Sequence, residues 1–312
     1  GSTPRRAPTP TCRPAGSRST ATCDEPPAAV KVARTRAELR EALAAAGRPL
    51  GLVPTMGWLH GGHRALMGRA RSENASAIAT IFVNPRQFNE AADYQRYPRD
   101  EARDVAICEE AGLDLVFAPP VEEVYPPGFD TKVVVGAVAA PLEGAARPGH
   151  FDGVATVVAI LFGLVGADRA YFGQKDAQQV MVIRRMALDL AIPTEVIACP
   201  TVREADGLAL SSRNVHLSPD ERAAAPVLWR ALTAARASWE AGERSGEALR
   251  ETMRRVLHEE PLARPDYVSV ADGRTLAELD RVDGPALLSL AVRFGETRLI
   301  DNEPLEPAGD SG

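Results

Sequence analysis

The feature that most constrains this fold is a regular alternation of short apolar runs and longer helical patterns between residue 30 and about residue 201. The runs are apolar at nearly every position and lie at residues 49–55, 76–84, 113–119, 169–173 and 194–200. Continuous apolar runs are typical of strands covered on both faces. Strands that alternate with helices form parallel sheets. We therefore predict an α/β fold with a Rossmann-like, doubly wound parallel sheet.

The pattern changes after residue 202. Two long helical stretches, at 219–240 and 245–259, precede three strand patterns, "DYVSVAD", "ALLSLAVRFG" and "TRLIDN", with no helix between them. Successive strands of this kind predict an antiparallel sheet in an α+β domain. We therefore predict a Rossmann-like domain over residues 29–201 and a smaller C-terminal α+β domain over residues 202–305.

The two ends of the chain, residues 1–28 and 306–312, are predicted to be disordered tails. The first is rich in Pro, Thr, Ser, Arg and Ala and has almost no aliphatic residues. Such a segment cannot bury enough apolar surface to offset the entropy of ordering it.

Charge, hydropathy and cysteine usage argue against several classes of protein. The net charge of −6 disfavours nonspecific nucleic-acid binding, which relies on a basic surface. The longest apolar run, residues 153–167, is shorter than the ~20 residues of a membrane helix and predicts a buried helix. The four cysteines form no CxxC pair, and Cys108 and Cys199 fall in apolar surroundings. We expect a cytoplasmic protein with no nucleic-acid or membrane partner.

Two histidines lie in a glycine-rich corner, "PTMGWLHGGH", between a predicted strand and a predicted helix. Glycines let the backbone approach a ligand closely, and the amides at a helix N-terminus favour anions. His60 and His63 form an HxGH pattern, which indicates nucleotidyl transfer with stabilisation of charge on a phosphate as pyrophosphate leaves. Two solvent-exposed loop histidines are the alternative. The corner lacks the GxGxxG order of a dinucleotide site and the Gly-Lys-Ser/Thr of a P-loop.

Two further polar clusters follow predicted strands. In "FGQKDAQQ", Lys175 offers a cation for phosphate, and Asp176 is placed to cap a helix or to accept from ribose hydroxyls. In "READGLALSSRN", two hydroxyls and the Arg213 guanidinium suit a polyphosphate. A capped helix with a solvated lysine and a polar turn are the respective alternatives.

The motifs together resemble the pantothenate synthetase family, also called pantoate–β-alanine ligase, within the HxGH nucleotidyltransferase superfamily. The resemblance runs from about residue 30 to residue 305 through "PTMGWLHGGH", "IFVNPRQF", "DYQRYPRD", "RPGHFDGVATVV", "YFGQKDAQQ", "PTVREADGLALSSRN" and "TRLIDN". It implies that ATP and Mg²⁺ drive the condensation of pantoate with β-alanine through a pantoyl adenylate, with release of AMP and pyrophosphate. It also implies a homodimer and a C-terminal lid. Another HxGH-type nucleotidyltransferase is the alternative.

The resemblance also implies the residues of the site. The ATP site would consist of Met56, Gly57, Trp58, Leu59, His60, Gly61, Gly62, His63, Gly173, Gln174, Lys175, Asp176, Val202, Leu210, Ser211, Ser212 and Arg213. His60, His63 and Lys175 would be catalytic, with His63 the candidate proton donor. Gln87 and Gln179 would hydrogen-bond pantoate. An apolar set would pack its gem-dimethyl group: Phe82, Val157 and Phe172. We assign no metal ligand, because the segment around Asp104 matches the family only weakly at the expected Mg²⁺ position.

Overall fold

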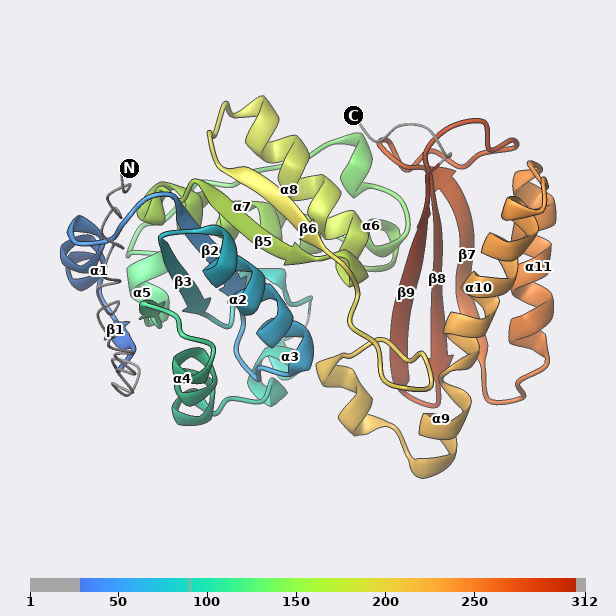
Figure 1. Ribbon diagram of the computed structural model, residues 1–312, viewed down its shortest axis with the longest axis horizontal. Helices are drawn as coiled ribbons and strands as arrows, with labels where there is room; N and C mark the ends of the chain where they lie inside the picture. The colour runs from blue at the N-terminus through green and yellow to red at the C-terminus, as the bar shows by residue number, and fades with distance from the viewer. Residues whose placement is uncertain (1–28, 90, 307–312) are drawn as a thin grey trace, which may run out of the picture.

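The structure is a computed structural model that describes residues 29–89 and 91–306, so the predicted tails lie outside these residues apart from residue 306. Its larger sheet has six strands (Figure 1). In spatial order they are β1 (Lys31–Ala33), β4 (Leu115–Phe117), β3 (Ser76–Ile81), β2 (Leu50–Thr55), β5 (Arg169–Gly173) and β6 (Glu195–Cys199). All neighbouring pairs are parallel, which confirms the predicted doubly wound sheet.

The predicted strand over residues 76–84 is wrong at its end. β3 stops at residue 81, and Asn84 caps a 3-10 turn, η1 (Pro85–Gln87). Pro85 has no N–H to give to a sheet ladder, so the strand cannot continue through it. The chain therefore leaves the sheet three residues earlier than the apolar pattern indicates.

The strand order places a topological switch point between β2 and β5. β3 and β4 lie on one side of β2, whereas β5 and β6 lie on the other. Ligands of doubly wound sheets bind beyond the carboxyl ends of the strands at such a point. The loops after residues 55 and 173, both predicted to hold phosphate, therefore start from neighbouring strands.

Helices cover both faces of the sheet, because successive strand side chains point to opposite sides. One face, which carries Leu52, packs against α1 (Arg36–Ala44), α7 (His150–Val165) and α8 (Ala177–Asp189). The other face, which carries Val53, packs against α2 (Gly61–Glu73) and α4 (Glu101–Glu110). α7 is the buried helix predicted at 153–167. Within the described residues, no helix is long and apolar enough to cross a membrane.

The C-terminal region forms an antiparallel sheet of β7 (Arg264–Asp272), β8 (Ala286–Phe294) and β9 (Thr297–Leu305). The helical stretch predicted over 219–240 is two helices, α9 (Pro219–Ala224) and α10 (Val227–Glu240). Pro226 lies between them, and a proline inside a helix removes a hydrogen bond and clashes with the preceding turn. α11 (Gly246–His258) follows, capped by Ser245.

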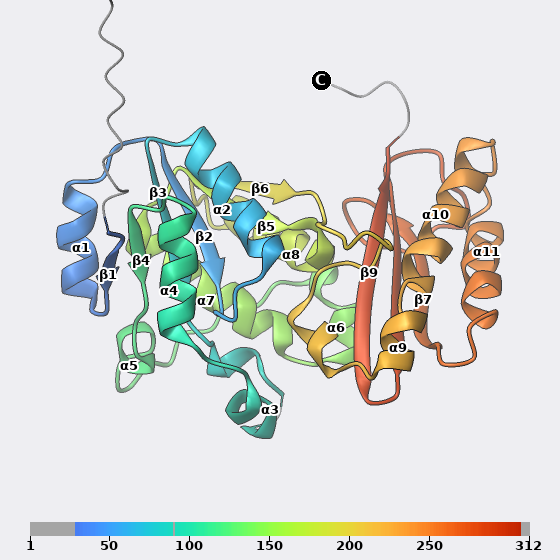
Figure 2. The same cartoon turned by 60° about the horizontal axis from the view of Figure 1, so that its bottom comes forward.

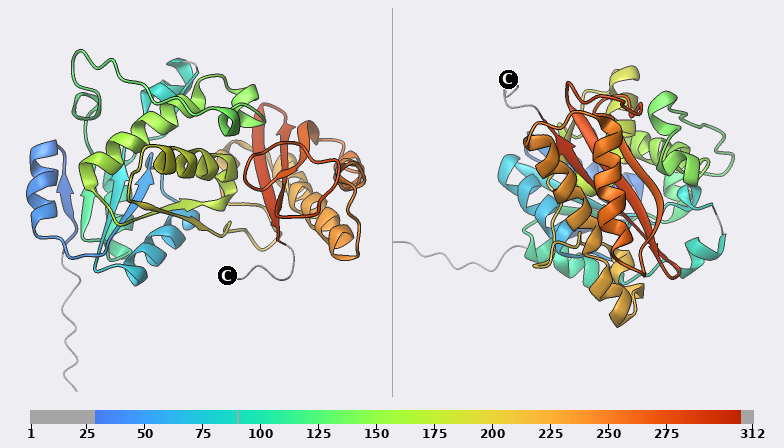
Figure 3. Two further views of the ribbon diagram at one scale, coloured as in Figure 1. Left: turned by 90° about the horizontal axis from the view of Figure 1, so that it is seen from above. Right: turned by 90° about the vertical axis from the view of Figure 1, so that its right-hand side faces the viewer.

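The C-terminal sheet lies between its own helices and the larger domain (Figures 2 and 3). Leu288 and Leu290 of β8 pack among the helices, whereas Leu287 belongs to the core of the larger domain. The face turned away from α10 and α11 is therefore a wall between the domains. Short elements complete the chain: α3 (Ala91–Arg96), α5 (Val121–Val124), η2 (Ala137–Ala139), α6 (Glu143–Ala146), η3 (Gln174–Asp176) and η4 (Ser212–His216).

Candidate active site

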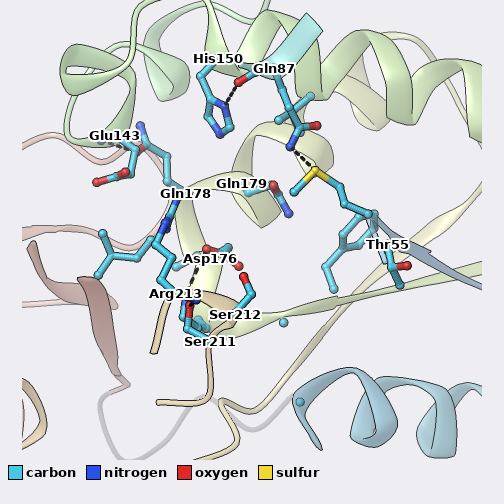
Figure 4. Close-up of a pocket in the computed structure, with 18 of the residues that line it drawn as sticks. Thr55, Gln87, Glu143, His150, Asp176, Gln178, Gln179, Ser211, Ser212 and Arg213 are labelled. Carbon is cyan, nitrogen blue, oxygen red and sulfur yellow. Dashed lines mark hydrogen bonds and ion pairs between the residues drawn. The ribbon is translucent and has the colours of Figure 1, made fainter. Parts of the chain in front are cut away.

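A cavity of about 920 Å³ is bounded by the carboxyl ends of β2 and β5 and by the C-terminal sheet. Figure 4 shows amide, carboxylate, hydroxyl and guanidinium side chains around it, among them Gln87, Gln179, Asp176 and Arg213. These residues come from η1, α8, η3 and η4. Because η3 and α8 are consecutive, the fold brings three distant stretches of sequence to one space.

The side chains of His60 and His63, the two histidines of the HxGH pattern, together cap the N-terminus of α2. Nδ1 of His60 accepts the backbone N–H of Gly62 at 3.1 Å, and Nδ1 of His63 accepts the backbone N–H of His60 at 3.3 Å. A ring nitrogen that accepts carries no proton, so a neutral ring with this arrangement has its proton on Nε2. Both rings line the cavity, so two Nε2–H groups are left as donors for a ligand.

Both imidazoles are held neutral by their surroundings. Burial, followed by the nearby His60, lowers the pKa of His63 to about 3. Burial and the charge of Lys175 also lower the pKa of His60. These lowered pKa values favour neutral imidazoles, which can donate a hydrogen bond from Nε2. Transfer of a proton by His63 would need the charged ring, so that role stays a prediction that the electrostatics do not favour.

The turn before the histidines faces away from the cavity. Gly57 and Trp58 have positive φ angles of 80° and 51°. The ring of Trp58 lies beside the Arg103 guanidinium, 4.9 Å from ring centroid to Cζ, and the Leu59 side chain is fully buried. These predicted ATP-site residues do not line the cavity, and neither does Gly61. They shape the loop that presents His60 instead.

Lys175 and Asp176 form a charged pair on the cavity wall. Nζ of Lys175 lies 3.5 Å from Oδ1 of Asp176. Although burial opposes it, Lys175 and Arg213 lower the pKa of Asp176 below its usual value. Asp176 is the N-cap of α8, but its side chain makes no capping bond, so the capping interpretation is wrong. Its carboxylate is left facing the cavity.

Gln174, also predicted to bind ATP, turns to the C-terminal domain instead of lining the cavity. Its Nε2 donates to Oδ1 of Asn302 on β9 at 3.2 Å. Nδ2 of Asn302 donates in return to the carbonyls of Gln174 at 3.0 Å and Lys175 at 2.9 Å. The neighbouring Asp301 forms a two-pronged ion pair with Arg203 at 2.6 and 3.0 Å. β9 therefore fixes the backbone of the loop that carries Lys175.

The linker after β6 supplies the remaining predicted ATP residues to the same wall: Val202, Leu210, Ser211, Ser212 and Arg213. The Ser211 hydroxyl caps η4 by accepting the N–H of Arg213 at 3.3 Å. The carbonyl of Val202 already accepts the N–H of Leu210 at 2.9 Å. Arg213 makes no ion pair with a described carboxylate, so its donors remain available to an anion.

The orientation of the Gln87 amide is determined by a chain of hydrogen bonds. The N–H of Arg86 and the Tyr125 hydroxyl both donate to Oδ1 of Asn84, at 3.2 and 2.7 Å. Nδ2 of Asn84 must then be the donor to Oε1 of Gln87, at 3.0 Å. Nε2 of Gln87 is left beside the thioether of Met56, 2.9 Å from Sδ, which is a weak acceptor. The site thus presents Gln87 as a donor to substrate oxygen.

Gln179 faces Gln87 across the same cavity, and its side chain has no hydrogen-bond partner among the described residues (Figure 4). The three side chains predicted to pack the gem-dimethyl group of pantoate line the same space: Phe82, Val157 and Phe172. Two neutral amides and an apolar wall suit a small acid that carries hydroxyls and a branched carbon skeleton.

Sequence reasoning missed several supporting residues, Asn84, Arg147 and Asn302, together with the part played by Asp104; for His150 it left a structural role and a substrate contact open. Asn84, Arg147, His150 and Asn302 lie inside the motifs that carry the resemblance. A sequence motif indicates that a residue belongs to the site, but it does not show which residue it hydrogen-bonds. The hydrogen-bond partners of these residues lie on other elements. Only the folded structure identifies what each of them holds.

The side chains of this site would suit a Mg²⁺ ion that is bound together with the phosphates of a nucleotide. No group of three or more His, Cys, Asp or Glu side chains is arranged for a metal in residues 29–89 and 91–306. The Asp104 carboxylate is already engaged by two backbone N–H groups. Mg²⁺ usually keeps several waters and binds phosphates with one or two carboxylates. We assign none of the described carboxylates to the ion, because Asp176, on the cavity wall, is the residue expected to meet ribose.

The sequence matches one family over almost its whole described length. A family profile described as pantoate-beta-alanine ligase matches residues 31–304. A pantothenate synthetase from Roseiflexus sp. (strain RS-1) is 62% identical over 277 residues, covering 89% of this chain and 100% of that protein. Another, from Chloroflexus aggregans (strain MD-66 / DSM 9485), is 61% identical over 275 residues, covering 88% and 99%.

Solved structures agree with the sequence relatives. The crystal structure of pantothenate synthetase from Thermus thermophilus matches with a TM-score of 0.85 at 53% identity, covering 89% of this chain and 100% of that one. A pantoate-beta-alanine ligase from Francisella tularensis, complexed with beta-gamma ATP and beta-alanine, matches with a TM-score of 0.71 at 33% identity, covering 88% and 97%.

Proposed function

The chain belongs to the pantoate–β-alanine ligase family, and from this premise we propose how its residues carry out the ATP-dependent condensation of pantoate with β-alanine. The enzyme is an ATP-using ligase of these two acids. We infer that the reaction passes through a pantoyl adenylate. A carboxylate resists attack by an amine, and transfer of AMP to it supplies the missing leaving group.

In the first step, the pantoate carboxylate attacks the α-phosphate of ATP. A bond forms between the carboxylate oxygen and phosphorus, the bond to the bridging oxygen breaks, and pyrophosphate leaves with its electron pair. Nε2–H groups of His60 and His63 donate to the oxygens on which charge develops. Lys175 and Arg213 bind the phosphates by charge. When bound, Mg²⁺ neutralises phosphate charge further.

In the second step, the amine of β-alanine attacks the acyl carbon of the adenylate. A C–N bond forms, the acyl C–O bond breaks, AMP leaves with the electron pair, and the nitrogen loses a proton. Gln87 and Gln179 hold the pantoyl part through its oxygens in both steps. Because both amides are neutral, they do not weaken the pantoate carboxylate as a nucleophile.

The observation that carries this proposal is the continuity of one cavity. The phosphate donors at the carboxyl ends of β2 and β5 and the amide pair of Gln87 and Gln179 line the same space. A nucleotide and a small acid bound there would meet at the α-phosphate. Val202 and Asp176 are the residues we assign to adenine and ribose.

Isotope exchange and product analysis test the mechanism. With ATP and pantoate but no β-alanine, labelled pyrophosphate should exchange into ATP, since adenylation is reversible. Added β-alanine should then yield pantothenate and AMP in equal amounts. Formation of ADP, or lack of exchange by enzyme that makes pantothenate, would contradict an adenylate intermediate.

Three further proposals rest on the family resemblance and on composition. We propose that Mg²⁺ accompanies ATP, that the enzyme is a cytoplasmic homodimer, and that it binds neither nucleic acid nor membrane. The free, buried thiols of Cys108 and Cys199 are compatible with a reducing compartment.

A further inference from the structure

Arg147 is a cation on the cavity wall with no carboxylate partner. It follows α6 and lines the cavity. Lys175 lies beside Asp176, and Arg298 pairs with Glu143, but Arg147 forms no ion pair with any described carboxylate. A partly buried guanidinium without an ion-pair partner loses some of its hydration, and a ligand can offset this loss by supplying negative charge.

Neighbouring groups hold Arg147 in place. Nδ1 of His150 lies 2.9 Å from the carbonyl oxygen of Gln87, and because a carbonyl only accepts, Nδ1 carries the proton. Nε2 of His150 is then an acceptor for Arg147, 3.2 Å away. Arg147 also donates to the Gln87 carbonyl at 3.4 Å. One edge of the guanidinium is thus fixed, and other N–H donors remain for a ligand.

The electrostatics agree with this geometry. Burial, followed by the charge of Arg213, lowers the pKa of Arg147. Burial and the charge of Arg147 lower the pKa of His150 to about 4, which keeps the ring neutral and able to accept. The charges of Glu143 and Asp176 oppose the lowering of the Arg147 pKa, but neither carboxylate forms an ion pair with Arg147. Among the described residues, its side chain hydrogen-bonds only to the neutral His150 ring and the Gln87 carbonyl. An arriving carboxylate would relieve this imbalance.

Three anionic groups enter the proposed reaction. The triphosphate already has Lys175, Arg213 and the N-terminus of α2. The pantoate carboxylate must stay reactive as a nucleophile and loses its charge in the first step, so a fixed guanidinium would oppose its use. The β-alanine carboxylate keeps its charge throughout and lacks any assigned partner.

We propose that Arg147 binds the carboxylate of β-alanine and so selects amine acceptors that carry an anion. This inference rests on the proposed adenylate mechanism. Arg147 touches the backbone of Gln87, whose side chain holds the pantoyl group, so an acceptor anchored there has its amine near the acyl carbon. Arg is suited to the task because its fork can bind both oxygens of a carboxylate.

The test compares β-alanine with its uncharged relative β-alaninamide as acceptors, in the wild type and in Arg147→Gln, Arg147→Lys and Arg213→Gln. Arg147→Gln should raise the KM for β-alanine by roughly 30- to 4000-fold, the range for removing one partner of a desolvated charge pair in a complex. It should also abolish the preference for β-alanine over β-alaninamide. Arg147→Lys, which keeps the charge, should restore part of that preference.

Pyrophosphate exchange without β-alanine separates this role from a structural one. Exchange by Arg147→Gln should stay close to the wild-type rate, whereas Arg213→Gln should lose it. If Arg147→Gln slowed exchange and weakened both acceptors equally, Arg147 would merely hold His150 and Gln87, and the inference would be overturned. An unchanged acceptor preference in Arg147→Gln would also overturn it. A wild type that makes product without exchange would instead refute the adenylate mechanism.

Discussion

The Asp104 carboxylate accepts the backbone N–H of Trp58 at 2.7 Å, and its other oxygen accepts that of Leu59 at 2.8 Å. Asp104 is only 1% exposed. Trp58 has a φ of 51°, which is uncommon for a residue with a side chain, so the turn depends on these two bonds. Helix α4 thereby sets the position of His60, two residues beyond Trp58.

Asp104→Asn should slow pyrophosphate exchange. An asparagine has one acceptor oxygen, so one of the two N–H groups would face a donor. A buried unsatisfied donor costs about 1–3 kcal/mol, which corresponds to roughly 5- to 150-fold. The melting temperature should fall as well. Glu110→Gln, on the exposed side of the same helix, is the control and should exchange normally. Normal exchange by Asp104→Asn would show that the turn keeps its conformation without both hydrogen bonds to residue 104.

His60 caps α2, and we propose for it a second, separable role in the chemistry. His60→Asn keeps an acceptor near the place of Nδ1 but removes the Nε2–H, whereas His60→Ala removes both. Both variants should lose roughly 10²- to 10³-fold in exchange, the scale for one transition-state donor. Only His60→Ala should also lose about 1 kcal/mol of stability through the cap. His63→Ala should lose exchange similarly.

Supplying preformed pantoyl adenylate to these histidine variants locates the defect. They should still transfer the pantoyl group to β-alanine, since no pyrophosphate leaves in that step. Variants that make the adenylate normally and fail only in transfer would place the histidines in amine attack.

Asn84→Asp should raise the KM for pantoate and leave ATP binding nearly unchanged. An ionised aspartate cannot donate to Oε1 of Gln87, so the Gln87 amide would lose its fixed orientation. Loss of such a bond typically costs about 1–3 kcal/mol. Titration calorimetry with each substrate measures the effect. Equal weakening of ATP and pantoate would show that Asn84 supports the whole domain rather than Gln87.

Asn302→Asp should weaken ATP binding although residue 302 belongs to the C-terminal sheet. The carboxylate cannot donate to the carbonyls of Gln174 and Lys175, so the loop that carries Lys175 would lose its support. Asn89→Asp is a matched control, because Asn89 donates to the Pro148 carbonyl at an exposed position. A Kd for ATP that changes equally in both variants would argue against a specific tie between the domains.

His150 should make the protein less stable in mild acid. Its pKa is about 4 when folded and ~6.5 in an unfolded chain. Between these values the unfolded chain binds more protons, so the free energy of unfolding falls as the pH falls from about 6.5 toward 4. Relative to neutral pH, His150 should lower the free energy of unfolding at pH 5 by about 2 kcal/mol. Denaturant unfolding at pH 7 and pH 5 measures the free energy of unfolding of the wild type and of His150→Asn. Between the two pH values this free energy should fall less in the variant than in the wild type. An equal fall in both proteins would contradict the role of His150.

The candidate site was predicted in part. The loops around His60, Lys175 and Arg213 were identified from local patterns, and all three residues line the cavity. The predictions for Leu59 and Gln174 as cavity residues differ from the structure, because a motif gives the order of residues but not the direction of each side chain. Leu59 points into the core, and Gln174 points to Asn302.

The sequence by itself determined the two kinds of sheet and the three polar loops, because the periodicity of apolar residues and the glycine and proline signals act over a few neighbouring positions. Only the tertiary structure decided the strand order that places β2 beside β5, and with it the meeting of their loops. It also decided the partners of Asp104 and Asn302, which lie 45 or more positions away in the chain. Such pairs depend on which faces pack together. An apolar pattern shows that a face is covered, but it does not show which element covers it.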